Sequence, residues 1–391
     1  MTSVPLGDVI QDARAGFASG AVDPRGVFQV RMNNVTRDGR WDLARKRYVP
    51  VPSDLERFLI RDGDVLFNAT NSAELVGKTA LVSGLTEPTT FSNHFLRLRP
   101  DPTRVEPAFL ARWLQWQFRR GTFEAMCQRW VGQAAVKRKR LLSVELRLPG
   151  LDEQRRIARI LDAAEALRVK RREAAAWTAR LPQSLLAQTI SRLPNELGPS
   201  CALASFVAEG DRINYGVVQP GADVDGGVPL IRAGDLVDGK VRRDKLRTID
   251  PAVDASYRRS RLVGNEILVS CVGSIGAVAM TNPNDIGSNI VRAIARVPIA
   301  SAPLRGYIAA YLGTAHVQRY FVAELRTVAQ PTLNIKQIRE LAVPVPPDAW
   351  LNGFATRAAA IDRLLERQLA QLTNLDALFA ALQHRAFSEI L

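Results

Sequence analysis

The sequence predicts an α+β protein built from two similar mixed α/β units, each followed by one long helix. Three observations support this fold class. A chain of 391 residues is too long for one ordinary hydrophobic core. Short motifs of the first half return in the same order about 200 residues later. Two stretches of about 40 residues each carry an apolar repeat with helical spacing. We place the first unit at 1–149, its helix at 150–198, the second unit at 199–346 and its helix at 347–391.

The duplication consists of five short matches, none of them strong by itself. Together they keep one order through both halves, which chance does not readily produce. The matched pairs are Val30–Val35 with Ile231–Leu236, Gly63–Phe67 with Gly264–Val269, Ser92–Phe95 with Ser288–Val291, Val131–Gln133 with Val328–Gln330, and Glu145–Pro149 with Leu341–Pro346.

Within each unit, short β-rich runs are bounded by Gly, Asn and Pro turn residues. These runs predict strands at Asp64–Phe67, Thr79–Val82, Phe95–Leu98, Glu266–Val269 and Ala277–Met280. One helix follows in each half, at Pro107–Arg120 and at Leu304–Tyr320. Phe109, Trp113 and Trp116 lie largely on one side of the first of these helices. This spacing favours a place in the core over base stacking.

The two long helices are expected at about Leu151–Arg192 and Trp350–Ile390, with a kink or interruption at Pro182. Neither helix can bury its apolar side alone, so we expect the two to pack as an antiparallel coiled coil. They would serve as spacers and as docking surfaces for partner proteins. The apolar residues assigned to this role are Ile157, Ile160, Leu161, Leu167, Ile361, Leu365, Leu372, Leu375 and Phe379.

In the second long helix, Ile361, Leu365, Leu372, Leu375 and Phe379 keep a mostly three-and-four spacing, which is typical of a coiled-coil seam. In the first, two acidic residues open the helix, where they complement the helix dipole. Both features support long, regular helices in which the apolar stripe faces another helix.

The charge favours a polyanionic partner. Lys and Arg total 53 against 39 Asp and Glu, which gives a net charge of +14 and a pI near 10.3. Residues 1–198 hold 32 of the basic and 21 of the acidic residues (+11), which leaves 21 and 18 (+3) for residues 199–391. Such an excess suits nucleic acid, because neutralised phosphates release counterions. The alternative is an arginine-rich composition without a role in binding.

The residues of a catalytic site are missing from the sequence. It contains no phosphate-binding loop, no dinucleotide-binding glycine motif, no metal-ligand spacing and no adenine methyltransferase motif. The three cysteines and three histidines are widely separated. The first residues lack a secretory signal, and no apolar run reaches the length of a membrane span, so we expect a cytoplasmic protein. We therefore expect a non-catalytic binding protein, either a DNA reader or a helical scaffold that does not read DNA.

Four motifs in order resemble the specificity (S) subunit of type I restriction-modification systems. Leu148–Ala158 is similar to the family's Leu-Pro-x-Leu-x-Glu-Gln-x-x-Ile-Ala segment at the start of its spacer helix. The others are Asn214–Gly221, which looks like the opening strand of the second domain, Asn265–Gly276, which resembles Gly-Asp-Leu-Leu-x-Ser…Gly-Ser-Ile-Gly, and Gln330–Ile335, which resembles Gln-x-x-Leu-Asn. Two segments depart from the family: 347–354 lacks the Glu-Gln pair, and 131–137 replaces the Leu-Asn turn.

The resemblance implies two target-recognition domains that read the two halves of a split, asymmetric site on double-stranded DNA. It also implies two modification (methyltransferase) subunits on the helices, and restriction subunits that join this core. S-adenosylmethionine would belong to the modification subunits, with no cofactor bound by this chain. The departures leave open whether both halves dock partners equivalently.

Residues for DNA contact are chosen by charge and by hydrogen-bonding capacity. In the first unit these are a polar loop with a lysine beyond it and a run of four cations, namely Asn68, Thr70, Asn71, Ser72, Lys78, Lys137, Arg138, Lys139 and Arg140. In the second unit they are Arg242, Arg243, Lys245, Arg258, Arg259, Arg261, Ser270 and Ser274. The alternatives are a solvated basic face and ordinary turns. Asn93 and Asn289 are expected to form structural turns.

Overall fold

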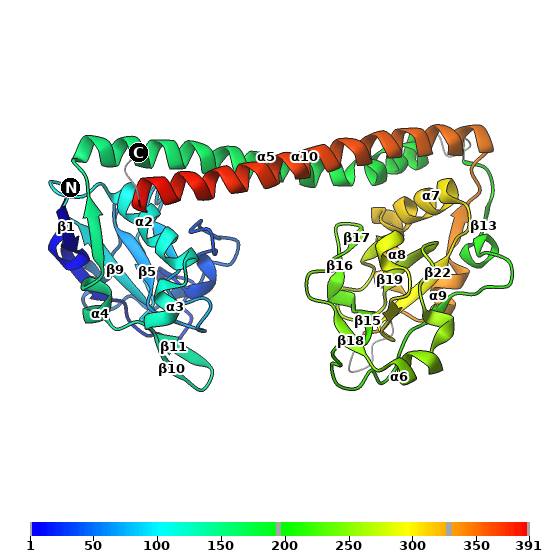
Figure 1. Ribbon diagram of the computed structural model, residues 1–391, viewed down its shortest axis with the longest axis horizontal. Coiled ribbons are helices and arrows are strands. Elements are labelled where there is room, and N and C mark those ends of the chain that lie inside the picture. Colours follow the sequence, from blue (N-terminus) through cyan, green and yellow to red (C-terminus); the bar gives the residue numbers. More distant parts are fainter. Residues whose placement is uncertain (1, 193–196, 326–330, 389–391) are drawn as a thin grey trace. The chain divides into compact units, whose positions relative to one another are not determined.

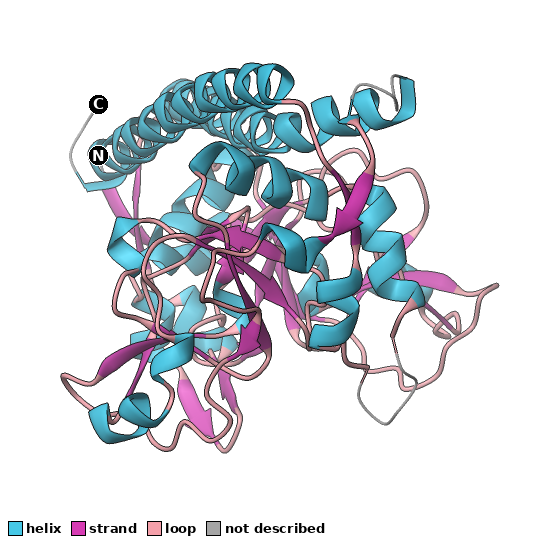
Figure 2. Cartoon of the chain, turned by 90° about the vertical axis from the view of Figure 1, so that its right-hand side faces the viewer, coloured by secondary structure: helices cyan, strands magenta, loops and turns pink. Residues whose placement is uncertain are grey.

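The computed structural model describes residues 2–192, 197–325 and 331–388. It divides into two compact units, residues 1–169 with 373–391 (unit 1) and residues 170–372 (unit 2). Both units mix short strands with helices (Figures 1 and 2), so the predicted α+β class is confirmed. Residues 328–330, which the sequence matches to Val131–Gln133 and which include Gln330 of the Leu-Asn motif, lie outside the described residues.

Three strand groups of unit 1 join segments that lie far apart in the sequence. An antiparallel sheet has the order β2–β9–β5–β7, with strands Ile10–Ala15, Phe95–Pro100, Val65–Asn68 and Thr79–Leu81. A second sheet has the order β4–β3–β8, with strands Tyr48–Val49, Val27–Val30 and Thr89–Phe91. The third group pairs β1 with β12, Thr2–Pro5 and Glu145–Leu148. The short helix α1 spans Leu55–Phe58. Helix α2, Pro107–Arg119, packs on β7 and buries Phe109 and Trp113 in the core, as predicted.

Unit 2 repeats these three groups and adds the antiparallel pair β16–β17, Leu236–Val237 and Lys240–Val241. Its four-stranded sheet has the order β14–β22–β19–β20, with strands Asn214–Tyr215, Ile294–Pro298, Glu266–Ser270 and Val278–Met280. Its other groups are β18–β15–β21, Arg247–Ile249, Val228–Ile231 and Asn289–Ile290, and β13–β23, Ser200–Ala202 and Ala342–Pro344. Strand β15 pairs parallel to β21 just as β3 pairs parallel to β8. The duplication seen in the sequence is therefore a duplication of topology.

One of the predicted matches was wrong in its register. Val30 pairs with Phe91, and the equivalent Ile231 pairs with Ile290. This places Asn289 three residues before the position of Asn93. Asn93 is exposed, whereas Asn289 is fully buried and donates to Asp254 at 2.8 Å. Both asparagines follow a serine in the sequence, but they occupy different positions in the fold.

Both units bury an arginine of the central sheet that bonds a carboxylate. In unit 1, Arg97 bonds Asp12, while Arg99 makes a two-point ion pair with Asp64 at 2.8 Å. In unit 2, Arg296 alone reaches Glu266 at 3.1 Å and Asp211 at 2.8 and 2.9 Å. A buried guanidinium is tolerable only when such partners satisfy it.

Two helix predictions needed correction. The helix expected at Leu304–Tyr320 is two helices, α7 at Ala302–Leu312 and α8 at Ala315–Ala323, because Thr314 accepts a hydrogen bond from the Val317 N–H and so starts a new helix. Pro182 does not interrupt the first long helix, α5, which runs unbroken over Leu151–Arg192. The ring removes one backbone donor, and packing of the helix into the core of unit 2 through Leu186 offsets that loss.

The second long helix, α10, spans Asp348–Ser388 and runs antiparallel to α5. In unit 1 the beginning of α5 meets the end of α10, where Arg168 bonds Asp376 at 2.6 Å. The ring of Phe387 packs there on Phe109 and Trp116. In unit 2 the end of α5 and the beginning of α10 share one core, which contains Leu186 and Phe354. The predicted antiparallel coiled coil is confirmed.

Candidate nucleic-acid interface

A small sheet in unit 1 brings together segments that are far apart in the sequence. It consists of β10 (Gln128–Trp130), β11 (Gln133–Ala135) and β6 (Thr70–Asn71), and we call it the hairpin sheet. Strand β11 pairs with β6 through Ala134 and Asn71. Helix α4, Arg138–Leu142, follows directly after β11, and α3, Thr122–Met126, comes directly before β10. The hairpin sheet therefore places the predicted polar loop and the predicted basic run side by side, on the side of unit 1 away from α5 and α10 (Figure 1).

The four cations of the basic run divide into two pairs. Arg138 donates to the backbone oxygen of Ala13 at 3.0 Å, and Arg140 donates to that of Met126 at 2.7 Å. Lys137 and Lys139 are exposed, and neither ammonium group has a partner within the described part of the chain. These two lysines are the available phosphate ligands of the run.

The polar loop is held mainly by its own hydrogen bonds. Asn68 is fully buried and donates to the backbone oxygens of Thr70 and His94, both at 3.1 Å, while its own oxygen accepts from Asn71. Ser72 bonds Glu74 at 2.7 Å and thereby lowers the pKa of that carboxyl. This network favours turn chemistry, the alternative that the sequence left open. Thr70 is half-buried at the edge of the hairpin sheet.

Lys78 has a structural place in the fold. Its side chain is 6% exposed, and Nζ donates to the backbone oxygens of Met32 at 2.8 Å and Val35 at 2.7 Å. Burial lowers the pKa of this ammonium group. An amine enclosed in this way cannot reach a phosphate, so we do not retain Lys78 as a DNA contact. The charge of a lysine in the sequence gives no sign of its burial.

In unit 2 the predicted cations also divide by their internal partners. Arg243 is paired with the buried Asp285 at 2.8 Å, and Arg261 with the buried Asp254. Arg242 lies 3.4 Å from Asp244. The remaining three are exposed and form no ion pair with another described residue, which leaves them as the better phosphate candidates: Lys245, Arg258 and Arg259.

The two serines proposed for unit 2 lie on the turn that matches the polar loop of unit 1. Ser270 occupies the place of Asn68, because the N–H groups of Gly77 and Gly276 bond these two residues at 2.8 Å in the same way. Both glycines have positive φ (96° and 81°), and a side chain on Gly77 would collide with Phe123. Ser270 is buried and bonded to a backbone oxygen, whereas Ser274 is exposed.

Sequence reasoning missed the tip of the β10–β11 hairpin. Trp130 pairs with Gln133, which leaves Val131 and Gly132 as a two-residue loop. Trp130 is 58% exposed and Val131 is fully exposed, while Arg129 next to them has only Glu124 as a partner among the described residues, at 3.4 Å. A signal for the hairpin is present in the sequence, since a glycine between two short β-forming runs is typical of such a turn.

The apolar residues assigned to partner docking differ in their exposure to solvent. Ile157, Leu161 and Phe379 are buried in the core of unit 1, so a partner cannot reach them while unit 1 is folded. Leu365 is also buried, and Ile160, Ile361, Leu372 and Leu375 are half-buried. Leu167 is exposed, together with Trp177, Leu181, Leu364 and Leu378 of the same two helices. The exposed group is therefore the better candidate for a docking surface.

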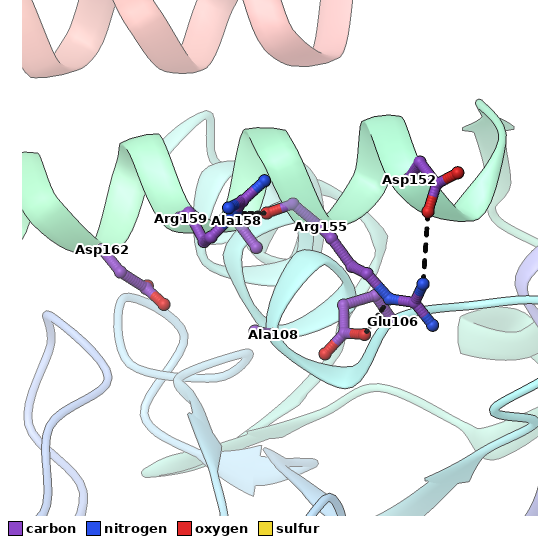
Figure 3. Close-up of a pocket in the computed structure, with 7 residues that line it drawn as sticks. All are labelled: Glu106, Ala108, Asp152, Arg155, Ala158, Arg159 and Asp162. Atoms are coloured by element: carbon purple, nitrogen blue, oxygen red, sulfur yellow. Dashed lines mark hydrogen bonds and ion pairs between the residues drawn. The ribbon is translucent and has the colours of Figure 1, made fainter.

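A groove of about 730 Å³ lies where α5 begins beside the start of α2 (Figure 3). Five charged side chains line it: Glu106, Asp152, Arg155, Arg159 and Asp162. Among them, Arg155 lies 3.2 Å from Asp152 and 3.5 Å from Glu106. Below it, Gln154 is fully buried and accepts from the Glu106 N–H at 2.8 Å, which explains the glutamine of the Glu-Gln pair.

The corresponding helix start in unit 2 is uncharged at these positions. The N–H of Gln154 bonds the oxygen of Gly150, and the N–H of Leu351 bonds that of Pro347 in the same way, so Leu351 takes the place of Gln154. By this correspondence Asp152, Arg155, Arg159 and Asp162 become Ala349, Asn352, Thr356 and Ala359. The departure from the family at 347–354 is thus a difference in the chemistry of two helix starts.

Within residues 2–192, 197–325 and 331–388, no group of three or more His, Cys, Asp or Glu side chains is placed to hold a metal ion. The described helices include none with the length and hydrophobicity needed to cross a membrane.

Comparison with known proteins agrees with the geometry. Residues 40–174 match the family described as the type I restriction modification DNA specificity domain. The EcoBI type I restriction enzyme specificity subunit of Escherichia coli is 35% identical over 169 residues, 41% of this chain and 35% of that protein. The putative MjaX specificity subunit of Methanocaldococcus jannaschii is 27% identical over 158 residues, 40% of this chain and 37% of that protein. The matches thus span little more than a third of these relatives.

A solved chain from a study of complex assembly and conformational transition in a type I R-M system shares the fold. It covers 99% of this chain and 97% of its own length, with a TM-score of 0.55 and 18% identity. The family match includes the hairpin sheet, α4 and the start of α5. Residues 40–174 are therefore similar to the DNA specificity domain of type I restriction-modification systems, and the resemblance found in the sequence is confirmed.

Proposed function

We propose that this chain is the DNA sequence-specificity subunit of a type I restriction-modification complex. Unit 1 and unit 2 each bind one half of a bipartite, asymmetric DNA site. The proposal rests mainly on the matched specificity domain, which contains the hairpin sheet and the exposed Lys137 and Lys139 that follow it. In addition, unit 2 repeats the sheet order of unit 1. The two units differ in sequence at the candidate contacts, so the half-sites differ as well.

In this proposal the chain itself is not catalytic. Two modification subunits dock on α5 and α10, bind S-adenosylmethionine and methylate adenine, and restriction subunits join this core. The exposed apolar side chains of the two helices support docking there. The groove of unit 1 is charged and its counterpart in unit 2 is not, which supports different binding of the two modification subunits by the two helix starts. The complex would work in the cytoplasm, together with the DNA that it reads.

The direct test is to assemble the chain with its modification subunits and to map methylated adenines in DNA by long-read sequencing. We expect one bipartite motif with a fixed spacer. The purified chain with S-adenosylmethionine alone should transfer no methyl group. Methyl transfer by the chain alone would contradict the proposal. A complex without sequence preference would instead favour the helical scaffold as the function.

The free lysines give a second test at the level of residues. We expect Lys137→Ala with Lys139→Ala to weaken DNA binding for every sequence alike. The slope of log K against log salt should become shallower by about 0.9 for each phosphate that the variant no longer neutralises. Lys336→Ala is a matched control, because Lys336 is an exposed lysine 3.9 Å from Glu340 in unit 2. A loss confined to one base position would show that these lysines contact bases rather than phosphates.

A further inference from the structure

The tip of the β10–β11 hairpin exposes two large apolar side chains that the fold of unit 1 does not use. Trp130 and Val131 lie outside the hydrophobic clusters of the unit, although Ala134 on the next strand is buried and anchors the hairpin to β6. Gly132 has a φ of 78°, and a side chain built on it would meet no atom within 4 Å. The described residues therefore leave most of the Trp130 side chain and all of Val131 in solvent.

Basic residues precede and follow the tip in the chain. Arg129 precedes Trp130, and Lys137 and Lys139 follow the hairpin with their ammonium groups in solvent. Among the described residues, Glu124 alone brings a carboxylate within ion-pair distance of these three cations, 3.4 Å from Arg129. An apolar tip on a hairpin that cations flank in the chain matches a nucleic-acid duplex, whose phosphates flank stacked bases. A protein partner that buried the same patch would have to supply several acidic groups.

The dimensions and chemistry agree with this occupant. The major groove of B-DNA admits a two-stranded β-ribbon, and the hairpin is a ribbon of that kind. Apolar side chains that enter a base step unstack it partly and bend the duplex. An indole ring can also stack on any base, because every base presents a π-face.

We propose that the Trp130–Val131 tip enters a groove of the half-site bound by unit 1, and that Trp130 packs against a base step and partly unstacks it. The inference rests on the proposed function, since it assumes that unit 1 binds DNA. It makes Trp130 a specificity-determining residue, because easily unstacked steps cost less to open. The equivalent stretch of unit 2 includes residues 326–330, which lie outside the described residues.

The test uses the assembled complex and duplexes that carry the fluorescent base 2-aminopurine at each position of the half-site in turn. We expect the wild-type complex to raise 2-aminopurine fluorescence at one step, and Trp130→Ala to abolish that rise. Binding of the cognate site should weaken about 10- to 100-fold, with an unchanged salt slope because the indole ring neutralises no phosphate. Trp130→Phe should retain most of the signal. Val22→Ala, which truncates another exposed apolar side chain of unit 1, should change neither.

Three outcomes separate this inference from the proposed function. If the wild-type complex prefers its site and Trp130→Ala behaves like wild type, only the inference is wrong. If Trp130→Ala instead prevents a modification subunit from binding, as measured by size-exclusion chromatography, the tip is a protein contact and the inference is again wrong. If the wild-type complex shows no site preference, the proposed function itself fails, whatever Trp130 does.

Discussion

At the scale of single residues, many polar groups that look functional in the sequence serve the fold. Asn34 and Asp235 occupy equivalent positions and accept hydrogen bonds from the Arg31 and Arg232 N–H groups, both at 2.9 Å. Both side chains are buried, as a turn with local hydrogen bonds requires. In unit 1, Lys78 also stabilises this turn by donating to the backbone oxygens of Met32 and Val35.

We expect Lys78→Met to lower the free energy of unfolding by about 1–3 kcal/mol, because it leaves two buried carbonyl oxygens without a donor. The measurement is urea denaturation followed by circular dichroism. Lys139→Met is the control, since its exposed side chain should change stability by no more than about 0.5 kcal/mol. Equal midpoints for the two variants would show that the Lys78 bonds contribute little.

Asp211 gives a prediction about pH. Burial opposes ionisation of its carboxyl, but the hydrogen bond and the charge of Arg296 outweigh that effect and lower the pKa below the ordinary value of 3.8. A carboxyl with a lower pKa in the folded state stabilises fully above 3.8, and this stabilisation is lost as the pH falls through the folded pKa. Asp211→Asn should therefore be less stable than wild type at pH 7, with a smaller difference near pH 3. Urea midpoints measured across this range that stayed parallel would contradict the prediction.

At the scale of elements, the inner face of α5 in unit 1 is not a continuous apolar stripe. Arg168 is 7% exposed, bonds Glu165 on its own helix and Asp376 on α10, and lies 4.4 Å from the ring centroid of Phe379. Arg119 of α2 approaches the same ring at 5.2 Å and donates to the buried Gln383 at 2.7 Å. Such a cluster fits only one alignment of the two helices, so its role is to fix their register.

We expect Arg168→Ala to destabilise the protein by about 3–5 kcal/mol, because Glu165 would keep a buried charge without its cation. Replacing both partners by apolar residues, Glu165→Leu with Arg168→Met, should restore much of that stability. Chemical denaturation of the single and double variants, compared with Arg155→Ala on an exposed part of the helix, decides the matter. A double variant as unstable as the single one would argue against a role limited to register.

At the scale of the whole molecule, each long helix belongs to both units. The division between the units falls after Val169 in α5 and after Leu372 in α10. The proposed function makes these helices the element that sets the spacer between the half-sites. A change in helix length should therefore change the spacer length without changing the bases that the two units bind.

Inserting seven residues after Val169 and seven after Leu372 tests this independence. Seven residues preserve the heptad repeat and lengthen a helix by about 10 Å, the length of about three base pairs. We expect the same two half-sites with a spacer longer by about three base pairs, measured by long-read mapping of methylated adenines. The insertion in α5 alone is the control and should prevent assembly. An unchanged spacer, or new half-site bases, would show that the helices do not set the spacing.

The duplication, the two long helices, most central strands and the basic character of unit 1 could be predicted from the sequence. These features follow from local periodicity and composition, which neighbouring residues carry in their own chemistry. Other features depend on tertiary contacts: Lys78 is buried, Asn93 and Asn289 are not equivalent, and β11 pairs with β6. The exposure of Trp130 at the hairpin tip is a further feature of this kind. Burial and strand pairing join residues far apart in the chain, and no local pattern specifies which of them will meet.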